Sequence, residues 1–272
     1  MPKPETALEH FSAVIITGGS SGIGKSFINL IGTLRPDISF CNLSRRRPDI
    51  IVPKLMLRHI ECDLSDSRQV EAGLVGVADF LETVAPEGRV LLINNSGFGI
   101  YGEFPEPEIG QQLEMMDLNM RAVVHMTGKL LPVLKKRGGA VMTVASTAAF
   151  QPTPYMSVYG ASKAFVLHWS LALNEELRGS SVRALAVCPG PTSSAFHRRA
   201  GLKEGTVPDA FGQTCEEVVL ESLRALAARK PLVVCGWKNR LVTSFVGGIP
   251  KALVARMAAR VMLRFRMGRV SR

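Results

Sequence analysis

The chain has 272 residues, of which 46% are hydrophobic and 21% charged, a composition that excludes disordered and fibrous chains. Its length suits one large α/β unit whose core needs no disulfide staples. The formal net charge of +10 belongs to residues 229–272, which hold eleven Lys/Arg and no Asp or Glu, whereas the first 228 residues hold 22 basic and 23 acidic residues.

Short apolar runs, typical of strands, alternate along the chain with longer helical patterns. The expected strands are 13–17, 38–43, 56–61, 90–93, 140–144, 182–187 and 232–235, and the expected helices are 23–34, 67–84, 108–136 as one long helix, 157–178 and 215–228. Such alternation indicates parallel βαβ units. We therefore expect an α/β fold, a doubly wound (Rossmann) parallel sheet of about seven strands in three α/β/α layers.

The same pattern predicts one domain over residues 1–236, followed by a basic amphipathic extension over residues 237–272. No linker divides the first part, and acidic residues vanish near Trp237. Met1 to His10 lacks the apolar stretch of a signal peptide, and the five cysteines form no CxxC pair. We therefore expect a cytoplasmic protein with reduced thiols and no metal.

A glycine-rich turn, TGGSSGIG from Thr17 to Gly24, lies between the first expected strand and helix. Glycines let the backbone approach a pyrophosphate, and the helix N-terminus offers N–H groups and a positive dipole end to the phosphates. The alternative is a turn that binds no ligand. We expect this loop to bind a dinucleotide through Gly18, Ser20, Ser21, Gly22, Ile23 and Gly24.

Three arginines, Arg45 to Arg47, follow the second strand, where NAD-binding sites usually carry an acidic residue. Guanidinium groups match a 2′-phosphate, so we predict NADP(H), with NAD(H) as the alternative, and assign Arg45 with Arg46 in support. Asp63 follows the third strand and is predicted to contact the adenine amino group, and Leu64 next to it is assigned to cofactor binding. The alternative for Asp63 is a helix N-cap, a role that we expect Ser65 to take.

Tyr159 and Lys163 lie four residues apart and share one face of the expected helix. A free phenol has a pKa of about 10, and a nearby cation lowers that pKa. Such tuning is what a general acid–base needs. Tyr155 has no lysine four residues further on, so we assign the pair to Tyr159 and Lys163.

Ser146 follows the strand 140–144, at the carboxyl end where open α/β sheets bind ligands. Its hydroxyl can donate a hydrogen bond to a substrate carbonyl oxygen, although Thr147 is a competitor for this role. Asn119 lies inside an expected helix, where asparagine is unfavourable unless its side chain has a specific partner.

Together these motifs resemble the short-chain dehydrogenase/reductase family in its short single-domain form, over roughly residues 10–235. TGGSSGIG matches its TGxxxGxG loop, residues 94–97 (NNSG) resemble its NNAG element, and residues 188–192 (CPGPT) resemble its PG motif. Ser96 in place of alanine is the departure. Four residues match its catalytic tetrad in order and spacing: Asn119, Ser146, Tyr159 and Lys163.

The resemblance implies roles for these residues. Tyr159 is the general acid in reduction and the base in oxidation, and Lys163 lowers the tyrosine pKa and holds the nicotinamide ribose. Ser146 polarises the carbonyl, and Asn119 anchors a water that relays protons. The resemblance also implies a homodimer or homotetramer and further cofactor contacts at Asn95, Gly97, Pro189, Gly190 and Thr192.

Residues 191–213 correspond to the family's substrate lid. Apolar and basic side chains mix in it, which suits an apolar carbonyl compound with an acidic or phosphorylated end; the alternative is a variable loop with solvated charges. The apolar members are Phe196, Leu202, Val207 and Phe211, and the basic ones are His197, Arg198, Arg199 and Lys203.

The tail, residues 241–272, begins with an uncharged run of ten residues, too short to span a bilayer. From Lys251 a basic amphipathic helix is expected, with Arg256, Arg260 and Arg264 on one side and Val254, Met257, Val261 and Phe265 mainly on the other. It could pack on the body or a partner subunit. It could instead contact an anionic membrane peripherally. Nucleic acid is the least supported partner, because the body is neutral and the tail poor in aromatic residues.

The sequence thus predicts an NADP(H)-dependent oxidoreductase that acts on a small-molecule carbonyl or secondary alcohol. An apolar or lipid-like substrate, such as a 3-ketoacyl compound or keto-lipid, is favoured. The alternatives are a non-catalytic NADP(H)-sensing or scaffold protein on the same fold, and an epimerase or dehydratase of the longer related subfamily, against which the glycine spacing argues.

Overall fold

The computed structural model describes residues 3–192, 200 and 212–266, the last three of these by their backbone alone. The described part contains a sheet of seven parallel strands in the order β3-β2-β1-β4-β5-β6-β7, as predicted. The strands are β1 (Phe11–Thr17), β2 (Ser39–Ser44), β3 (Leu57–Glu61), β4 (Arg89–Asn94), β5 (Gly139–Val144), β6 (Val182–Cys188) and β7 (Leu232–Val234).

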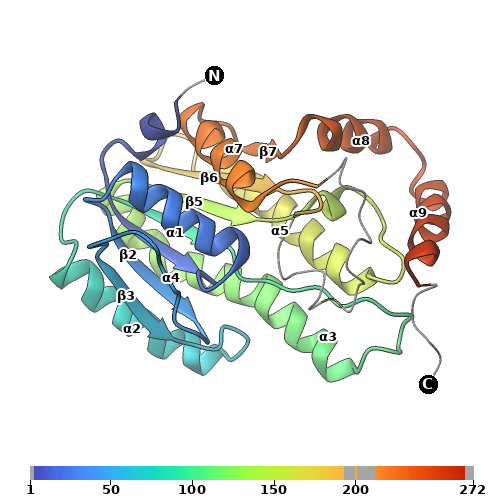
Figure 1. Cartoon of the computed structure of the whole chain (residues 1–272), viewed down its shortest axis with the longest axis horizontal. Coiled ribbons are helices and arrows are strands. Elements are labelled where there is room, and N and C mark those ends of the chain that lie inside the picture. Colours follow the sequence, from blue (N-terminus) through green and yellow to red (C-terminus); the bar gives the residue numbers. More distant parts are fainter. Residues whose placement is uncertain (1–2, 193–199, 201–211, 267–272) are drawn as a thin grey trace.

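Helices cover both faces of this sheet (Figure 1). One face packs against α1 (Gly22–Leu34), α7 (Cys215–Ala227) and the short 3-10 helix η1 (Pro4–Leu8). The other face packs against α2 (Ser67–Thr83), α4 (Ala122–Arg137) and α5 (Ser157–Glu176). Because strand side chains alternate between faces, Val14 and Ile16 of β1 enter the first core and Ala13 and Ile15 the second. The three predicted layers are confirmed.

The predicted single helix over residues 108–136 is wrong in one respect. A π-helical turn, η2 (Asp117–Arg121), lies between α3 (Ile109–Met116) and α4. The turn contains Asn119, whose side chain bonds outside its own helix to Phe98 and Ser162. Single π-helical turns of this kind frequently mark functional sites.

The N-cap of α2 is Asp66, not Ser65 as we expected. The Asp66 carboxylate accepts a hydrogen bond from the backbone N–H of Arg68 at 2.8 Å. Ser65 instead donates its hydroxyl to Asp63 at 2.6 Å. Asp66 therefore caps α2, and Asp63 orders the turn after β3 by accepting the Ser65 hydrogen bond.

The chain beyond β7 forms two helices, α8 (Trp237–Gly247) and α9 (Lys251–Arg266). Figure 1 shows α8 continuing from the β7 end of the molecule and α9 turning away from it. No helix in the described part of the chain combines the length and apolarity needed to cross a bilayer. The eight lid residues named above and the side chains of Arg264 and Phe265 lie outside the described residues.

Candidate active site

A cavity of about 1070 Å³ lies at the carboxyl ends of the strands, where β1 and β4 meet and the strand order reverses. Open α/β sheets bind ligands at this switch point, and the volume lies just above the range of about 300–1,000 Å³ for small-molecule sites. All but two of the predicted site residues line it. They are Gly18, Ser20, Ser21, Gly22, Ile23, Arg45, Arg46, Asp63, Leu64, Asn95, Gly97, Ser146, Tyr159, Lys163, Pro189, Gly190 and Thr192.

The glycine loop has the close backbone approaches that its sequence predicts. Gly18 and Gly22 adopt φ angles of +71° and +56°, in the left-handed region that favours glycine. A Cβ on Gly24 would lie 2.3 Å from the Gly18 carbonyl oxygen. Gly24 is absent from the cavity lining and therefore acts by letting α1 pack against the loop.

Two asparagines hold the loop in place. Gly19 donates its N–H to Oδ1 of Asn42 at 2.7 Å, and Nδ2 of Asn95 donates to the carbonyl oxygens of Thr17 at 2.9 Å and Gly18 at 3.2 Å. Asn95 thereby joins the end of β4 to the end of β1. Asn42 was not predicted. An asparagine inside an apolar strand is a sequence signal that could have identified it, because a buried polar side chain needs a hydrogen-bond partner, and the structure shows Asn42 fully buried.

The N-terminus of α1 faces this cavity. Ser21 is its N-cap, but the serine side chain makes no capping hydrogen bond, and the first turn carries no acidic residue. The amide groups and the positive dipole end are thus not neutralised by the helix's own first turn. A cradle of glycines before such a helix terminus fits a pyrophosphate group.

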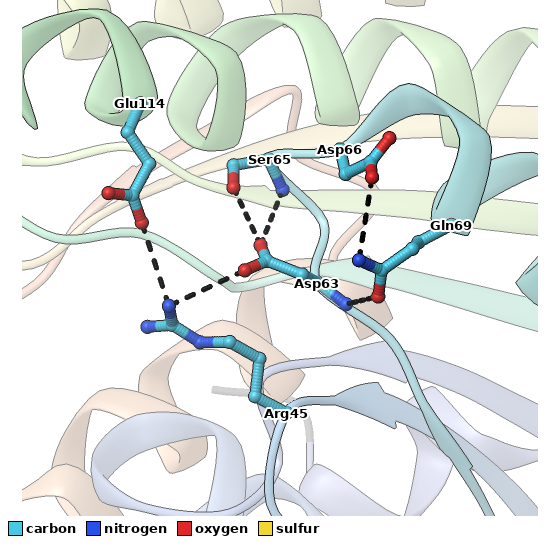
Figure 2. Close-up of polar contacts among 6 residues, drawn as sticks. All are labelled: Arg45, Asp63, Ser65, Asp66, Gln69 and Glu114. Atoms are coloured by element: carbon cyan, nitrogen blue, oxygen red, sulfur yellow. Dashed lines mark hydrogen bonds and ion pairs between the residues drawn. The ribbon is translucent and has the colours of Figure 1, made fainter. Parts of the chain in front are cut away.

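Arg45, which lines the cavity just past the end of β2, lies between two carboxylates (Figure 2). Its Nη1 is 3.6 Å from Oδ2 of Asp63 and 3.5 Å from Oε1 of Glu114, and its side chain is 56% exposed. Burial favours the neutral form of Asp63, but hydrogen bonds from Ser65 and the charge of Arg45 outweigh it, so the pKa of Asp63 is lowered. Glu114, on α3, was not predicted, because only the fold brings it beside Arg45.

The reaction centre joins the end of β5 to the first turns of α5. Tyr159 and Lys163 are both buried. Nζ of Lys163 donates to the Val144 carbonyl oxygen at 2.9 Å and lies 5.9 Å from the centroid of the Tyr159 ring. A hydrogen bond links the Tyr159 and Ser146 side chains, so the structure brings together the three groups that the sequence singled out.

Burial dominates the ionisation of this pair. It raises the pKa of Tyr159 to about 12, against a smaller lowering by the Ser146 hydrogen bond. It also lowers the pKa of Lys163 to about 8. Both shifts follow because desolvation disfavours the charged forms of the two groups. The role of Lys163 in lowering the tyrosine pKa stays a prediction. Near pH 7 the phenol is neutral and able to donate its proton.

Asn119 is buried beside this centre but does not line the cavity. Its Nδ2 donates at 3.0 Å to the Phe98 carbonyl and to the Ser162 hydroxyl, and its Oδ1 accepts from the Phe98 N–H at 3.1 Å. A Cβ on Gly97 would lie 2.9 Å from Asn119 Oδ1 and 3.1 Å from Lys163 Nζ. Asn119 thus ties the loop after β4 to α5, next to the lysine.

The C-terminal helices form a wall of the same cavity, which the sequence did not predict. Asn239, Val242 and Thr243 of α8 and Val261 and Met262 of α9 line it. A Cβ on Gly190 would lie 2.2 Å from Asn239 Nδ2, so α8 packs directly on the PG motif. Tyr101 donates its hydroxyl to the Met262 carbonyl at 2.9 Å. These contacts join positions far apart in the chain, so no local sequence pattern predicts them.

Comparisons with known proteins agree with this geometry. The family model described as short chain dehydrogenase matches residues 12–205. An uncharacterized oxidoreductase of Schizosaccharomyces pombe is 30% identical over 171 residues, 61% of this chain and 56% of that protein. Serine 3-dehydrogenase of Agrobacterium fabrum is 29% identical over 195 residues, 67% of this chain and 73% of that protein. Dehydrogenase/reductase SDR family member 7B of Xenopus laevis is 28% identical over 273 residues, 93% of this chain and 83% of that protein.

Solved structures share the fold. A short chain dehydrogenase from Burkholderia cenocepacia in complex with NADP has a TM-score of 0.73 at 23% identity, covering 91% of this chain and 98% of that one. A short-chain dehydrogenase from Sphingobium yanoikuyae in complex with NADPH has a TM-score of 0.71 at 25% identity, covering 96% and 99%. A short chain dehydrogenase/reductase from Burkholderia phymatum in complex with NAD has a TM-score of 0.70 at 19% identity, covering 86% and 92%.

Proposed function

The chain belongs to the short-chain dehydrogenase/reductase family, and from that premise we propose that it is an NADP(H)-dependent oxidoreductase. It transfers hydride between the nicotinamide and a carbonyl or secondary alcohol. One observation carries the proposal: Ser146, Tyr159 and Lys163 meet in a cavity that also contains the glycine cradle. A phosphate-binding cradle and an acid–base group in one cavity are what a nicotinamide enzyme requires.

The residues of this chain have distinct tasks in the proposed reduction. When bound, the nicotinamide supplies the hydride. Tyr159, neutral because burial raises its pKa to about 12, gives its phenolic proton to the carbonyl oxygen. Ser146 donates a hydrogen bond to the same oxygen and favours the charge that develops on it. Both hydroxyls belong to side chains that line the cavity.

Lys163 and Asn119 act beside this pair. The bond from Lys163 Nζ to Val144 uses one ammonium proton, and the remaining donors of a charged lysine can hold ribose hydroxyls. Asn119 positions the loop beside the lysine through its bonds to Phe98 and Ser162. A proton relay through water near Asn119 remains part of the proposal. In oxidation the roles of proton donor and acceptor reverse.

Arg45 and Arg46 support NADP(H) over NAD(H) in this proposal. Both line the cavity, at the end that the proposal assigns to the adenine, and a guanidinium can hold a 2′-phosphate. The solved relatives hold either nicotinamide, so the choice rests on the arginines. NAD(H) is the alternative cofactor. Asp63, ordered by Ser65 and Arg45, and Leu64 are the proposed adenine contacts.

The substrate end of the cavity favours an apolar carbonyl compound, such as a 3-ketoacyl compound or keto-lipid. Apolar side chains line it beside the reaction centre: Phe98, Ile100, Met156, Val261 and Met262. Sites of this kind orient a largely apolar ligand by a few polar groups, here the hydroxyls of Ser146 and Tyr159.

The proposal places the protein in the cytoplasm as a homodimer or homotetramer, with the basic extension at an anionic membrane surface. Exposed apolar side chains on α3, α4 and α5 support self-association, because large exposed apolar patches mark interfaces. They are Ile109, Leu113, Val124 and Phe165. The division into a catalytic domain, residues 1–236, and an extension is likewise proposed, although α8 and α9 contribute to the cavity wall.

NADPH absorbance, followed with a panel of 3-ketoacyl thioesters, keto-lipids, steroids and quinones, tests this function. We expect oxidation of NADPH with at least one carbonyl class and weaker activity with NADH. A non-catalytic NADP(H) sensor would bind NADPH tightly and oxidise it with none of the panel. The complete Ser–Tyr–Lys set in the cavity argues against a sensor, since binding alone does not need it.

A further inference from the structure

Helix α8 presents its apolar side outward. Trp237, Leu241 and Phe245 recur at intervals of four residues and are 64%, 62% and 70% exposed. Asn239 and Thr243, on the other side of the helix, are buried. A surface helix normally buries its apolar stripe and exposes its polar one. The reversal in α8 leaves a row of large side chains without cover from the described body.

Helix α9 repeats the pattern. Leu253, Met257 and Val261 recur at the same interval and are 49%, 48% and 53% exposed. Arg256 and Arg260 lie beside this row on the helix surface and are also exposed. We call the two rows the α8–α9 face: Trp237, Leu241, Phe245, Leu253, Met257 and Val261.

Polar contacts hold α9 to the body and leave its apolar row open. Nζ of Lys251 donates to the Phe150 carbonyl at 3.2 Å, and the Tyr101 hydroxyl donates to the Met262 carbonyl. Val254 is the buried apolar anchor of α9. Because α9 contacts the body at several points along its length, its orientation and the direction of its exposed row are fixed.

The face adjoins the cavity. Val242 of α8 and Val261 of α9 both line the cavity and are both about half exposed. Apolar surface thus continues from the outside of the molecule to the rim of the proposed substrate site. A molecule lying against the α8–α9 face could enter the cavity without crossing a charged barrier of these helices.

We propose that the α8–α9 face docks on an anionic lipid bilayer, and that the apolar substrate enters the cavity from that bilayer past Val242 and Val261. The second half rests on the proposed hydride-transfer activity, whereas the docking does not. Exposed apolar rows beside cations are the pattern of helices that lie in the membrane interface. Residues 229–272 hold eleven Lys/Arg and no acidic residue, which complements an anionic surface.

Charge favours an anionic bilayer over a second copy of the chain or a nucleic acid as the partner of the α8–α9 face. A two-fold contact between copies brings the same patch of each subunit together, so the α8–α9 face would set basic helices against basic helices. Nucleic acid would engage the cations but leave the six large apolar side chains in water, and the body has a net charge of −1 over residues 1–228. A bilayer satisfies both the apolar rows and the cations.

Trp237 provides a direct probe, because the chain has two tryptophans and Trp169→Phe leaves the one on the α8–α9 face. The full-length variant is mixed with vesicles of phosphatidylcholine with or without phosphatidylserine. We expect a blue shift of Trp237 fluorescence and cosedimentation with the anionic vesicles alone, both weakening as salt is raised. No shift and no cosedimentation with anionic vesicles would overturn the docking.

Paired substitutions test which surface binds. Leu241→Asp with Phe245→Asp should weaken binding to anionic vesicles by about a hundredfold, because each carboxylate removes apolar area and repels the lipid surface. Ile51→Asp with Val75→Asp makes the same charge change at positions 75% and 71% exposed and should bind as the parent does. Thermal melting verifies that both variants fold. Equal binding by the two pairs would contradict the proposed face.

Light scattering and turnover separate the remaining outcomes. If Leu241→Asp with Phe245→Asp splits an oligomer that the control pair preserves, the face is an interface between copies and the membrane proposal fails. Delivery from the bilayer predicts that this double substitution abolishes reduction of a keto-lipid in vesicles but preserves reduction of a water-soluble ketone. Loss of both, or of neither, refutes the delivery route. Vesicle binding without turnover of any carbonyl would refute the proposed hydride-transfer activity and leave the docking intact.

Discussion

Glu114→Gln should raise the affinity of the protein for NADPH and leave that for NADH unchanged. In the structure Glu114 Oε1 lies 3.5 Å from Nη1 of Arg45, the guanidinium proposed to hold the 2′-phosphate. A phosphate that engages Arg45 must compete with this carboxylate. The 2′-phosphate also brings a charge of about −1.5 to −2 close to the Glu114 carboxylate, which repels it.

The distance sets the size of the effect. Unit charges 3.5 Å apart interact by about 1 kcal/mol in bulk water, and exposed ion pairs contribute about 0.2–1 kcal/mol. Arg45 is 56% exposed, so these solvent-screened values apply. Removing the competing pair and the repulsion together should raise NADPH affinity by about three- to tenfold, since about 1.4 kcal/mol is tenfold. NADH lacks the 2′-phosphate and should change by less than about twofold.

Titration of the cofactor's fluorescence on the purified protein measures both affinities, and Glu108→Gln is the matched control. Glu108 is the exposed N-cap residue of the same helix, so its substitution makes the same change in net charge away from Arg45. Raising the salt should shrink the Glu114→Gln effect. An equal gain for NADH, or a loss of NADPH affinity, would refute this reasoning.

Two further substitutions, Lys163→Met and Gly24→Ala, probe the buried lysine and the glycine loop. The pKa of Lys163 is lowered from 10.5 to about 8, so the unfolded chain binds more protons between these values and the lysine's contribution to stability rises with pH. Relative to Lys163→Met, the free energy of unfolding of the wild type should rise by up to about 3 kcal/mol from pH 7 to pH 10, because one pKa unit corresponds to 1.36 kcal/mol. Urea denaturation measures both proteins across this range. A constant difference in unfolding free energy between them would contradict the burial effect. Gly24→Ala places a Cβ 2.3 Å from the Gly18 carbonyl oxygen and should lower stability by about 1–3 kcal/mol and weaken NADPH binding. Gly128→Ala, with nothing within 4 Å, should stabilise the protein slightly, and equal melting shifts for the two alanine variants would show that the loop is not tightly packed.

The parallel sheet was predictable because its signal is local. The inner strands are short apolar runs bounded by turns, and burial on both faces, as for Val14 and Ile15 of β1, makes such a run continuous. The position of Ser146 followed from the same regularity. Residues just past parallel strands share one edge of the sheet, so motifs distant in sequence converge there.

The features that escaped prediction depend on the fold as a whole. The π-helical turn contains Asn119, whose side chain bonds Phe98 and Ser162, two partners that only the fold brings close to it. The raised pKa of Tyr159 reflects burial, which outweighs the hydrogen bond to Ser146. The pairing of Glu114 with Arg45 and the approach of Met262 to Tyr101 are likewise tertiary contacts.

Turnover by Tyr159→Phe is the measurement that tests the central claim most directly. The substitution removes one hydroxyl from the cavity and keeps the buried ring. The account predicts that the variant binds NADPH within about twofold of the wild type and that kcat falls by at least about a hundredfold, as expected for a lost general acid. NADPH oxidation at the wild-type rate by this variant would contradict it.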